Sequence, residues 1–157
     1  MSTDPTLSPQ AIISITARIH TAGNDPDDGT LGNVDNENGV VLLGVAGREF
    51  VLNRADITDF QQHTSHDYIL GEGGNVKRPK WNDPRNPRLT LGDLHRHQPY
   101  LRFVPPPDVL DDDWHVERAD VTVNGADGGT VSYVALAGEP TIWLGYESGL
   151  TLYLDRT

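Results

Sequence analysis

Cysteine is absent from this 157-residue chain, which excludes disulfide bonds, thiolate zinc sites and cysteine nucleophiles. Basic residues are scarce, since twelve Lys and Arg stand against 23 Asp and Glu and give a formal net charge of −11. This charge argues against DNA and RNA as partners, because proteins that bind them present basic surfaces. The sequence has no apolar run of membrane-spanning length and no signal-peptide pattern within residues 1–10. We therefore expect a cytoplasmic protein.

Glycine and proline, by contrast, are frequent, with 16 and 11 copies, and this frequency disfavours long helices. Between them lie nine short runs rich in Val, Ile, Leu, Thr and Tyr, a composition typical of strands. These runs are residues 12–20, 40–45, 48–53, 67–70, 99–104, 115–124, 130–136, 141–146 and 150–154. Several alternate as half-buried strands do, and in one of them Glu117 is expected on the same side as Ala119 and Val121.

These patterns predict an all-β fold, an antiparallel β-sandwich of eight to nine strands with at most one helical turn. The length suits a single domain. We expect a flexible N-terminal tail at residues 1–10 and one sandwich over residues 11–157.

Charge is unevenly distributed along the chain. Residues 75–88 contain five bases and one acid, a local charge of +4, so the rest of the chain carries −15. The prolines and Trp81 of this segment predict a long basic loop over residues 71–92. Acidic residues gather in other predicted loops, where their mutual repulsion would be offset by a divalent cation. The acidic clusters are Asp25, Asp27 and Asp28, then Asp35 and Glu37, then Asp111, Asp112 and Asp113.

The order of several short motifs resembles the PLAT family, also called LH2 or lipoxygenase-homology domains, whose name stands for polycystin, lipoxygenase and alpha-toxin. The motifs are the strand at 13–19 with Thr21-Ala22-Gly23, the pair Gly29-Thr30, the strand at 40–44, Phe60 followed by Asp67-Tyr68-Ile69, the strand at 94–103, Trp114 opening an alternating strand, Tyr133, and Trp143-Leu144. The resemblance covers residues 12–155, and it implies a C2-like sandwich that serves as a binding module. The chain departs from the family pattern in the insertion at 35–38 and in the long basic loop.

Several members of the PLAT family bind calcium in the loops at one end of the sandwich, and the resemblance implies such a site here. The residues of this chain that match the family's ligands are Asp27, Asp28, Gly29, Thr30, Asp67, Asp112 and Asp113. Calcium takes six to eight oxygen ligands from flexible loops that mix carboxylates and carbonyls, which suits this set. The alternative is that these aspartates only stabilise turns.

Partner contacts are expected from the basic loop and from one tryptophan that follows an acidic cluster. The residues are Lys77, Arg78, Lys80, Trp81, Arg85 and Trp114. A Trp beside Lys and Arg suits either a membrane interface or a protein partner. The net charge opposes anionic lipid, so a protein partner is favoured over a lipid surface; the oligomeric state is left open.

Two other functions compete with the calcium-binding module. One is a structural or adaptor subunit of a larger assembly that docks through the basic loop. The other is a metal-dependent enzyme in which His95 and His97, on one face of an extended segment, join His63 and His66 around zinc. The HExxH, GxSxG, Walker A and GxGxxG motifs are all absent, so we expect no catalysis.

Overall fold

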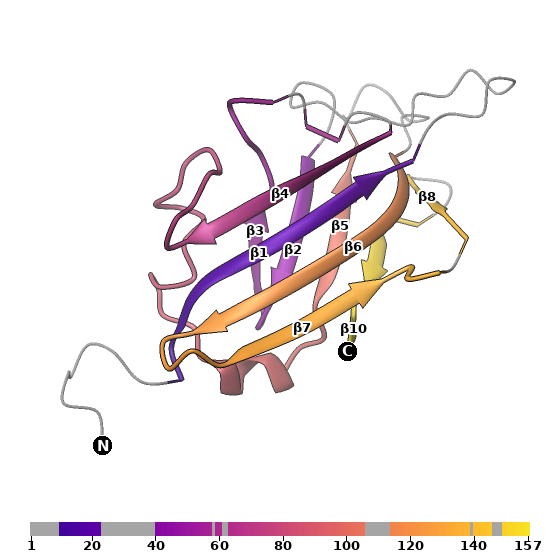
Figure 1. Cartoon of the computed structure of the whole chain (residues 1–157). Helices are drawn as coiled ribbons and strands as arrows, with labels where there is room; N and C mark the ends of the chain where they lie inside the picture. The colour runs from indigo at the N-terminus through magenta and orange to yellow at the C-terminus, as the bar shows by residue number, and fades with distance from the viewer. Residues whose placement is uncertain are drawn as a thin grey trace, which may run out of the picture.

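The computed structural model describes residues 10–22, 40–57, 59–60, 63–105, 114–138, 140–145 and 149–157, which form two antiparallel sheets packed face to face (Figure 1). The first sheet consists of β1 (Ile12–Thr21), β4 (Thr64–Gly71), β6 (Trp114–Gly125), β7 (Thr130–Ala135), β8 (Ile142–Leu144) and β10 (Asp155–Arg156). The second sheet consists of β2 (Val40–Val45), β3 (Arg48–Val51), β5 (Tyr100–Val104) and β9 (Thr151–Tyr153). The prediction of an all-β sandwich is confirmed.

Strand order places distant parts of the chain side by side. The first sheet runs β10-β7-β6-β1-β4, with β8 also paired to β6, and the second runs β3-β2-β5-β9. In Figure 1 the first sheet faces the viewer and the second lies behind it. The C-terminal residues cross from one sheet to the other at the buried Leu154, because β9 pairs with β5 and β10 pairs with β7.

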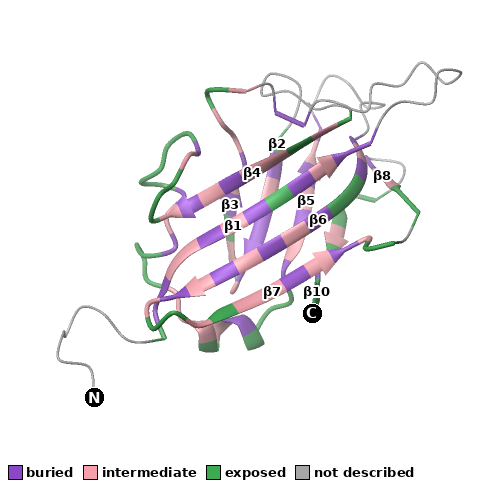
Figure 2. Cartoon of the chain, in the orientation of Figure 1, coloured by how far each residue is buried: buried purple, intermediate pink, exposed green. Residues whose placement is uncertain are grey.

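The core lies between the sheets and is built by alternation along the strands (Figure 2). Ile15 and Ala17 of β1 and Val41 and Leu43 of β2 are almost fully buried, while the residues between them are more exposed. Each large aliphatic side chain buried in this way contributes about 1.5–3 kcal/mol. The two inner faces therefore hold the sandwich together.

In the first residues of β6, the alternation of buried and exposed side chains differs from the prediction. Val116 is fully buried and Glu117 is exposed, so the prediction that Glu117 lies on the inner side is wrong. The reason is a β-bulge, since the register shifts between the pairs His20–Arg118 and Thr21–Val116. A bulge adds one residue to a strand and reverses the alternation beyond it.

Candidate functional site

The basic loop, residues 71–92, is fixed against the edge of the second sheet by Asn82. This side chain is 5% exposed, and its Oδ1 accepts a hydrogen bond of 2.8 Å from the backbone N–H of Val51 on β3. Its Nδ2 donates to the carbonyls of Lys77 and Arg78, at 3.3 and 3.2 Å. Asn82 thus joins the loop to the edge strand.

Arg48 of β3 fastens the far part of the same loop. Its Nη1 donates to the carbonyls of Asp83 and Pro87, at 2.7 and 3.2 Å, and its Nη2 donates to the carbonyl of Trp81 at 3.2 Å. The guanidinium also lies 4.7 Å from the centre of the Phe50 ring. The loop is therefore a rigid wall beside β3, and it covers an edge that would otherwise be open to another strand.

Between this wall and the outer face of the second sheet lies a groove of about 930 Å³. It is lined by Val40, Glu49, Val51, Asn53, Lys77, Arg78, Trp81 and Asn82. Trp81 is 78% exposed and Val40 is 39% exposed. Among the described residues, the other large hydrophobic side chain that is exposed is Tyr153, on β9 of the second sheet. The second sheet thus presents apolar surface on its outer side.

The floor of the groove is ordered by a cluster around Glu49. The carboxylate accepts hydrogen bonds from Tyr100 Oη at 2.9 Å and from Arg102 Nε and Nη2 at 2.8 and 2.9 Å. The hydrogen bond with Arg102 holds the pKa of Glu49 below its ordinary value, so this acid is ionised and paired. Tyr100 reaches Glu49 by lying across Gly44, where a Cβ atom would come within 2.3 Å of the ring.

Two basic side chains at the groove, those of Lys77 and Arg78, have no ion-pair partner among the described residues. No hydrogen bond or ion pair joins the side chain of Lys77 or Arg78 to any part of the chain that the structure describes. Arg78 also has a φ of +52°, in the left-handed region that costs a non-glycine residue about 1 kcal/mol or more. The loop therefore holds Arg78 in a strained backbone conformation, and its guanidinium is available to pair with an acid of a partner.

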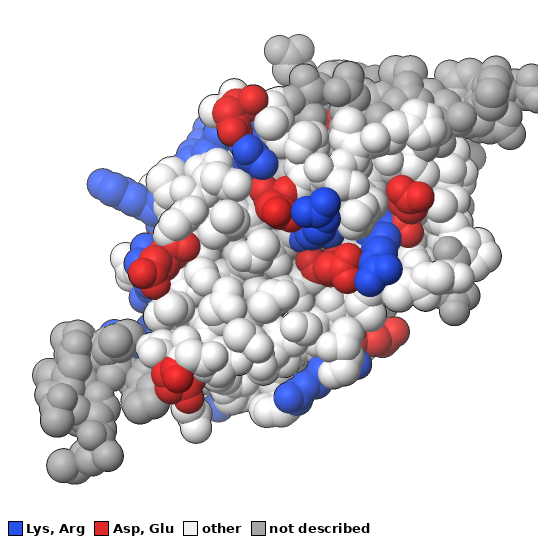
Figure 3. Space-filling view, in the orientation of Figure 1, with Lys and Arg blue, Asp and Glu red and all other residues white. Residues whose placement is uncertain are grey.

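The outer face of the first sheet is different in kind. Arg18 pairs with Asp67 at 3.4 Å, and Arg118 pairs with Asp120 at 2.9 Å. His20 lies beside this ladder, 3.8 Å from the Asp120 carboxylate. Figure 3 shows acidic and basic groups interleaved on this face. Its charges are balanced locally, so the second sheet is the better docking surface.

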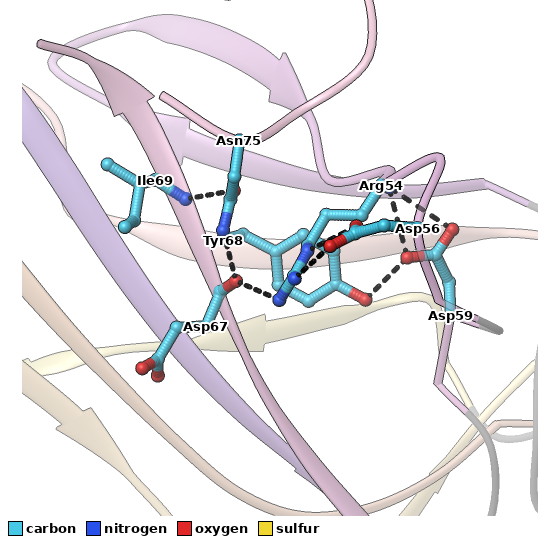
Figure 4. A network of polar contacts seen from close by, with 7 residues as sticks. All are labelled: Arg54, Asp56, Asp59, Asp67, Tyr68, Ile69 and Asn75. Carbon is cyan, nitrogen blue, oxygen red and sulfur yellow. Dashed lines mark hydrogen bonds and ion pairs between the residues drawn. The ribbon is translucent and has the colours of Figure 1, made fainter. Parts of the chain in front are cut away.

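A polar network anchors the chain beside β4 (Figure 4). Asp59, 1% exposed, accepts hydrogen bonds from Tyr68 Oη at 2.8 Å and from the backbone N–H of Arg54 at 3.1 Å. Arg54 Nη1 and Asn75 Nδ2 both donate to the carbonyl of Asp67, at 3.0 Å each. Burial, together with the nearby Asp59 carboxylate, raises the pKa of Tyr68. The phenol therefore stays protonated and donates.

Replacement of Tyr68 by Phe should test this network. The change removes a hydrogen bond from the buried Asp59 carboxylate, and a buried acceptor that loses its partner costs about 1–3 kcal/mol. Urea unfolding should show that loss. Tyr153→Phe is the matched control, because its side chain is 59% exposed, and it should change stability by less than about 0.5 kcal/mol. Equal effects of the two variants would contradict the assignment.

Of the predicted calcium ligands, Asp67 is the one that lies within the described residues. Asp27, Asp28, Gly29, Thr30, Asp112 and Asp113 lie outside them. The carboxylate of Asp67 is paired with Arg18 on the outer face of the first sheet. The described ranges contain no group of three or more His, Asp or Glu placed to hold a metal ion.

The predicted partner contacts divide into two groups. Lys77, Arg78, Lys80, Trp81 and Arg85 all lie exposed on the basic loop, and three of them line the groove. Arg85 forms an ion pair with Asp83, in which its Nη2 lies 3.0 Å from the Asp83 Oδ2.

Trp114, by contrast, is 0% exposed, so the prediction that it contacts a partner or membrane is wrong. The residue begins β6 with its side chain directed inward. Its ring packs against Phe60 and Phe103 at centroid distances of 5.1 and 6.3 Å, and its Nε1 donates to Thr21 Oγ1 at 3.1 Å. Its position next to an acidic cluster suggested exposure, but the strand's inward face decides otherwise.

The histidine hypothesis loses its geometric basis. Residues Leu91–His95 form a 3-10 helix, labelled η1, so His95 and His97 do not share the face of an extended strand. The Asp93 carboxylate accepts hydrogen bonds from the backbone N–H and the hydroxyl of Thr90, at 2.8 and 3.0 Å, which stabilises the start of this turn.

Sequence reasoning missed the sheet side of the groove. Val40, Glu49 and Val51 are outward positions of predicted strands, and the sequence does not show which outward positions face a loop from elsewhere. Asn82 carried a partial signal, since an Asn-Asp-Pro run marks a turn. Its role as the link to β3 depends on tertiary structure.

No family model and no curated protein matches this chain. Among solved structures, a match is found to the alpha-toxin of Clostridium perfringens isolated from an avian strain, with a TM-score of 0.53 and 15% sequence identity. The chain folds like part of an alpha-toxin. The match covers 97% of this chain and 33% of the toxin chain, so this chain spans about a third of the toxin's length. At this identity the likeness shows the fold alone.

The described part of the chain contains no helix with the length and apolar character needed to cross a membrane.

Proposed function

We propose that this chain is a non-catalytic binding module of PLAT-like fold that docks a protein partner through its basic loop. The observation that carries the proposal is the anchoring of the loop, because Asn82 and Arg48 fix it to β3 while Trp81 stays 78% exposed. A large aromatic side chain held in solvent by a rigid backbone is typical of a contact site. A rigid site also loses little entropy on binding.

Affinity capture from the source cell, followed by quantitative mass spectrometry, tests the docking proposal. The bait is the wild-type chain, compared with a variant that carries Lys77→Gln, Arg78→Gly, Lys80→Gln and Arg88→Gln. We expect at least one protein to be enriched on the wild type and to be lost on the variant. Arg18→Gln with Arg118→Gln is the control, because it removes charge from the other face. Enrichment that survives the loop variant would contradict the proposal.

The proposal includes calcium, held by Asp27, Asp28, Gly29, Thr30, Asp67, Asp112 and Asp113. Two features support it: the resemblance to the PLAT family, and the clustering of acids in a chain of net charge −11, where a divalent cation would offset repulsion. Such a cation would stabilise the folded chain.

Calcium titrated into metal-stripped protein should raise the midpoint of unfolding, whereas magnesium should not. A ligand that binds only the folded state adds about 2.7 kcal/mol at one hundred times its Kd. Asp28→Asn and Asp113→Asn should abolish the response. Asp67→Asn should weaken it, while Arg18→Gln, which breaks the same ion pair but keeps the carboxylate, should leave it intact. No rise up to millimolar calcium would rule the site out.

A further inference from the structure

We infer that the groove between the basic loop and the outer face of the second sheet binds an acidic peptide segment that carries a large apolar side chain. This inference rests on the proposed function, because it names the class of partner for the same docking surface. The groove volume of about 930 Å³ lies within the range of about 300–1,000 Å³ that is typical of ligand sites in proteins.

The apolar part of the occupant follows from the lining. Val40, Val51 and Trp81 bring two aliphatic side chains and an indole to one groove, and Val40 and Trp81 are unusually exposed for their type. Covering apolar surface contributes about 25 cal/mol for each Å² removed from water. A large aliphatic or aromatic side chain of the partner would gain this contribution from the groove.

The acidic part follows from charge complementarity. Lys77 and Arg78 line the groove without ion-pair partners among the described residues. Glu49, the acidic residue of the lining, is already paired with Arg102. The groove is thus locally positive in a chain of net charge −11, so an acid on the partner is attracted here and repelled elsewhere.

The size of the groove favours a peptide over a membrane. An extended anionic surface would face much of the chain at once, and the net charge of −11 opposes that approach. A short acidic segment contacts the groove and little else. It therefore meets the two free cations, Lys77 and Arg78, at close range.

The peptide binds through its side chains and does not extend the sheet. An added strand would need the free edge of β3, but the N–H of Val51 is bound to Asn82. Arg48 holds the loop along the same strand. The edge is therefore closed, and the occupant lies on the face of the sheet, beside the loop.

Panning of a random twelve-residue peptide library displayed on phage against the whole chain tests the inference. We expect the enriched peptides to contain at least two Asp or Glu and a Leu, Phe or Trp. The enriched peptide, synthesised with a fluorescein label, then serves as the probe in fluorescence anisotropy. Its Kd should rise between 50 and 300 mM salt, because salt screens the charge contacts.

Variants in and beside the groove make the test specific. Trp81→Ala should raise the Kd at least tenfold, and Lys77→Ala with Arg78→Gly should raise it five- to tenfold. Glycine is chosen at position 78 because it accepts the positive φ, so the fold is kept. The matched controls are Tyr153→Ala, an exposed aromatic outside the groove lining, and Lys80→Ala with Arg88→Ala, two bases of the same loop outside it. Both controls should leave the Kd within twofold.

Three outcomes would overturn the inference. One is the enrichment of no peptide, or only of peptides without acids. Another is an equal loss of peptide affinity in the control variant Lys80→Ala with Arg88→Ala. That result would show that the loop as a whole binds the peptide and that the groove does not matter. The third is flotation with phosphatidylserine vesicles that Trp81→Ala abolishes, which would replace the peptide with anionic lipid. The proposed function fails separately, when the loop variant keeps its captured protein.

Discussion

Replacement of Trp114 by Ala should destabilise the protein by about 3–5 kcal/mol, the largest effect that we expect from a single substitution. The indole is 0% exposed and packs between aromatic rings of other segments, Phe60 and Phe103. Its removal leaves a cavity, and it leaves Thr21 Oγ1 without the donor that now lies 3.1 Å away. Urea unfolding followed by circular dichroism measures the loss, which should leave the slope of the transition unchanged.

Two further tryptophan variants serve as comparisons for that measurement. Trp114→Phe keeps most of the ring and loses the hydrogen bond, so it should cost less than the alanine change. Trp81→Ala removes the same side chain from a site that is 78% exposed, and it should change stability by less than about 0.5 kcal/mol. If Trp81→Ala proved as damaging as Trp114→Ala, the burial assigned to the two residues would be wrong.

Replacement of Asn82 by Ala should release the basic loop and weaken binding in the groove. It leaves the N–H of Val51 and the carbonyls of Lys77 and Arg78 without their present partner, at a cost of about 1–3 kcal/mol. A released loop exposes its Lys80–Trp81 bond to trypsin. We expect cleavage there at least ten times faster than in the wild type, and a peptide affinity reduced as far as in Trp81→Ala.

Asn82→Asp is the graded comparison for that experiment. It keeps an acceptor for the N–H of Val51 but loses the donor to the loop carbonyls, so the cleavage rate should fall between those of wild type and Asn82→Ala. Should trypsin cleave Asn82→Ala as slowly as the wild type, the loop would be held by Arg48 and the backbone alone.

The strands were largely predictable because their signal is local. About four to eight residues of alternating side chains suffice to indicate a strand, and β2 was predicted with its observed bounds, Val40–Val45. β10 was missed, since the two residues Asp155–Arg156 are too few to show any period. The bulge before Arg118 was missed because it depends on the pairing with β1.

By itself, the sequence determined the general chemistry of this protein: it has no cysteine, it is acidic, and it contains one basic segment that includes a tryptophan. These properties follow from counting and from neighbours along the chain. The resemblance to the PLAT family also implied a β-sandwich, and the two antiparallel sheets confirm that fold class.

Tertiary structure alone decided which tryptophan is available to a partner and where the basic loop lies. Trp81 and Trp114 each follow a charged residue in the sequence, yet one is 78% exposed and the other 0%. The difference depends on contacts across long separations, such as Thr21 with Trp114 and Val51 with Asn82. Such contacts leave no local pattern, because each partner residue suits many other environments equally well.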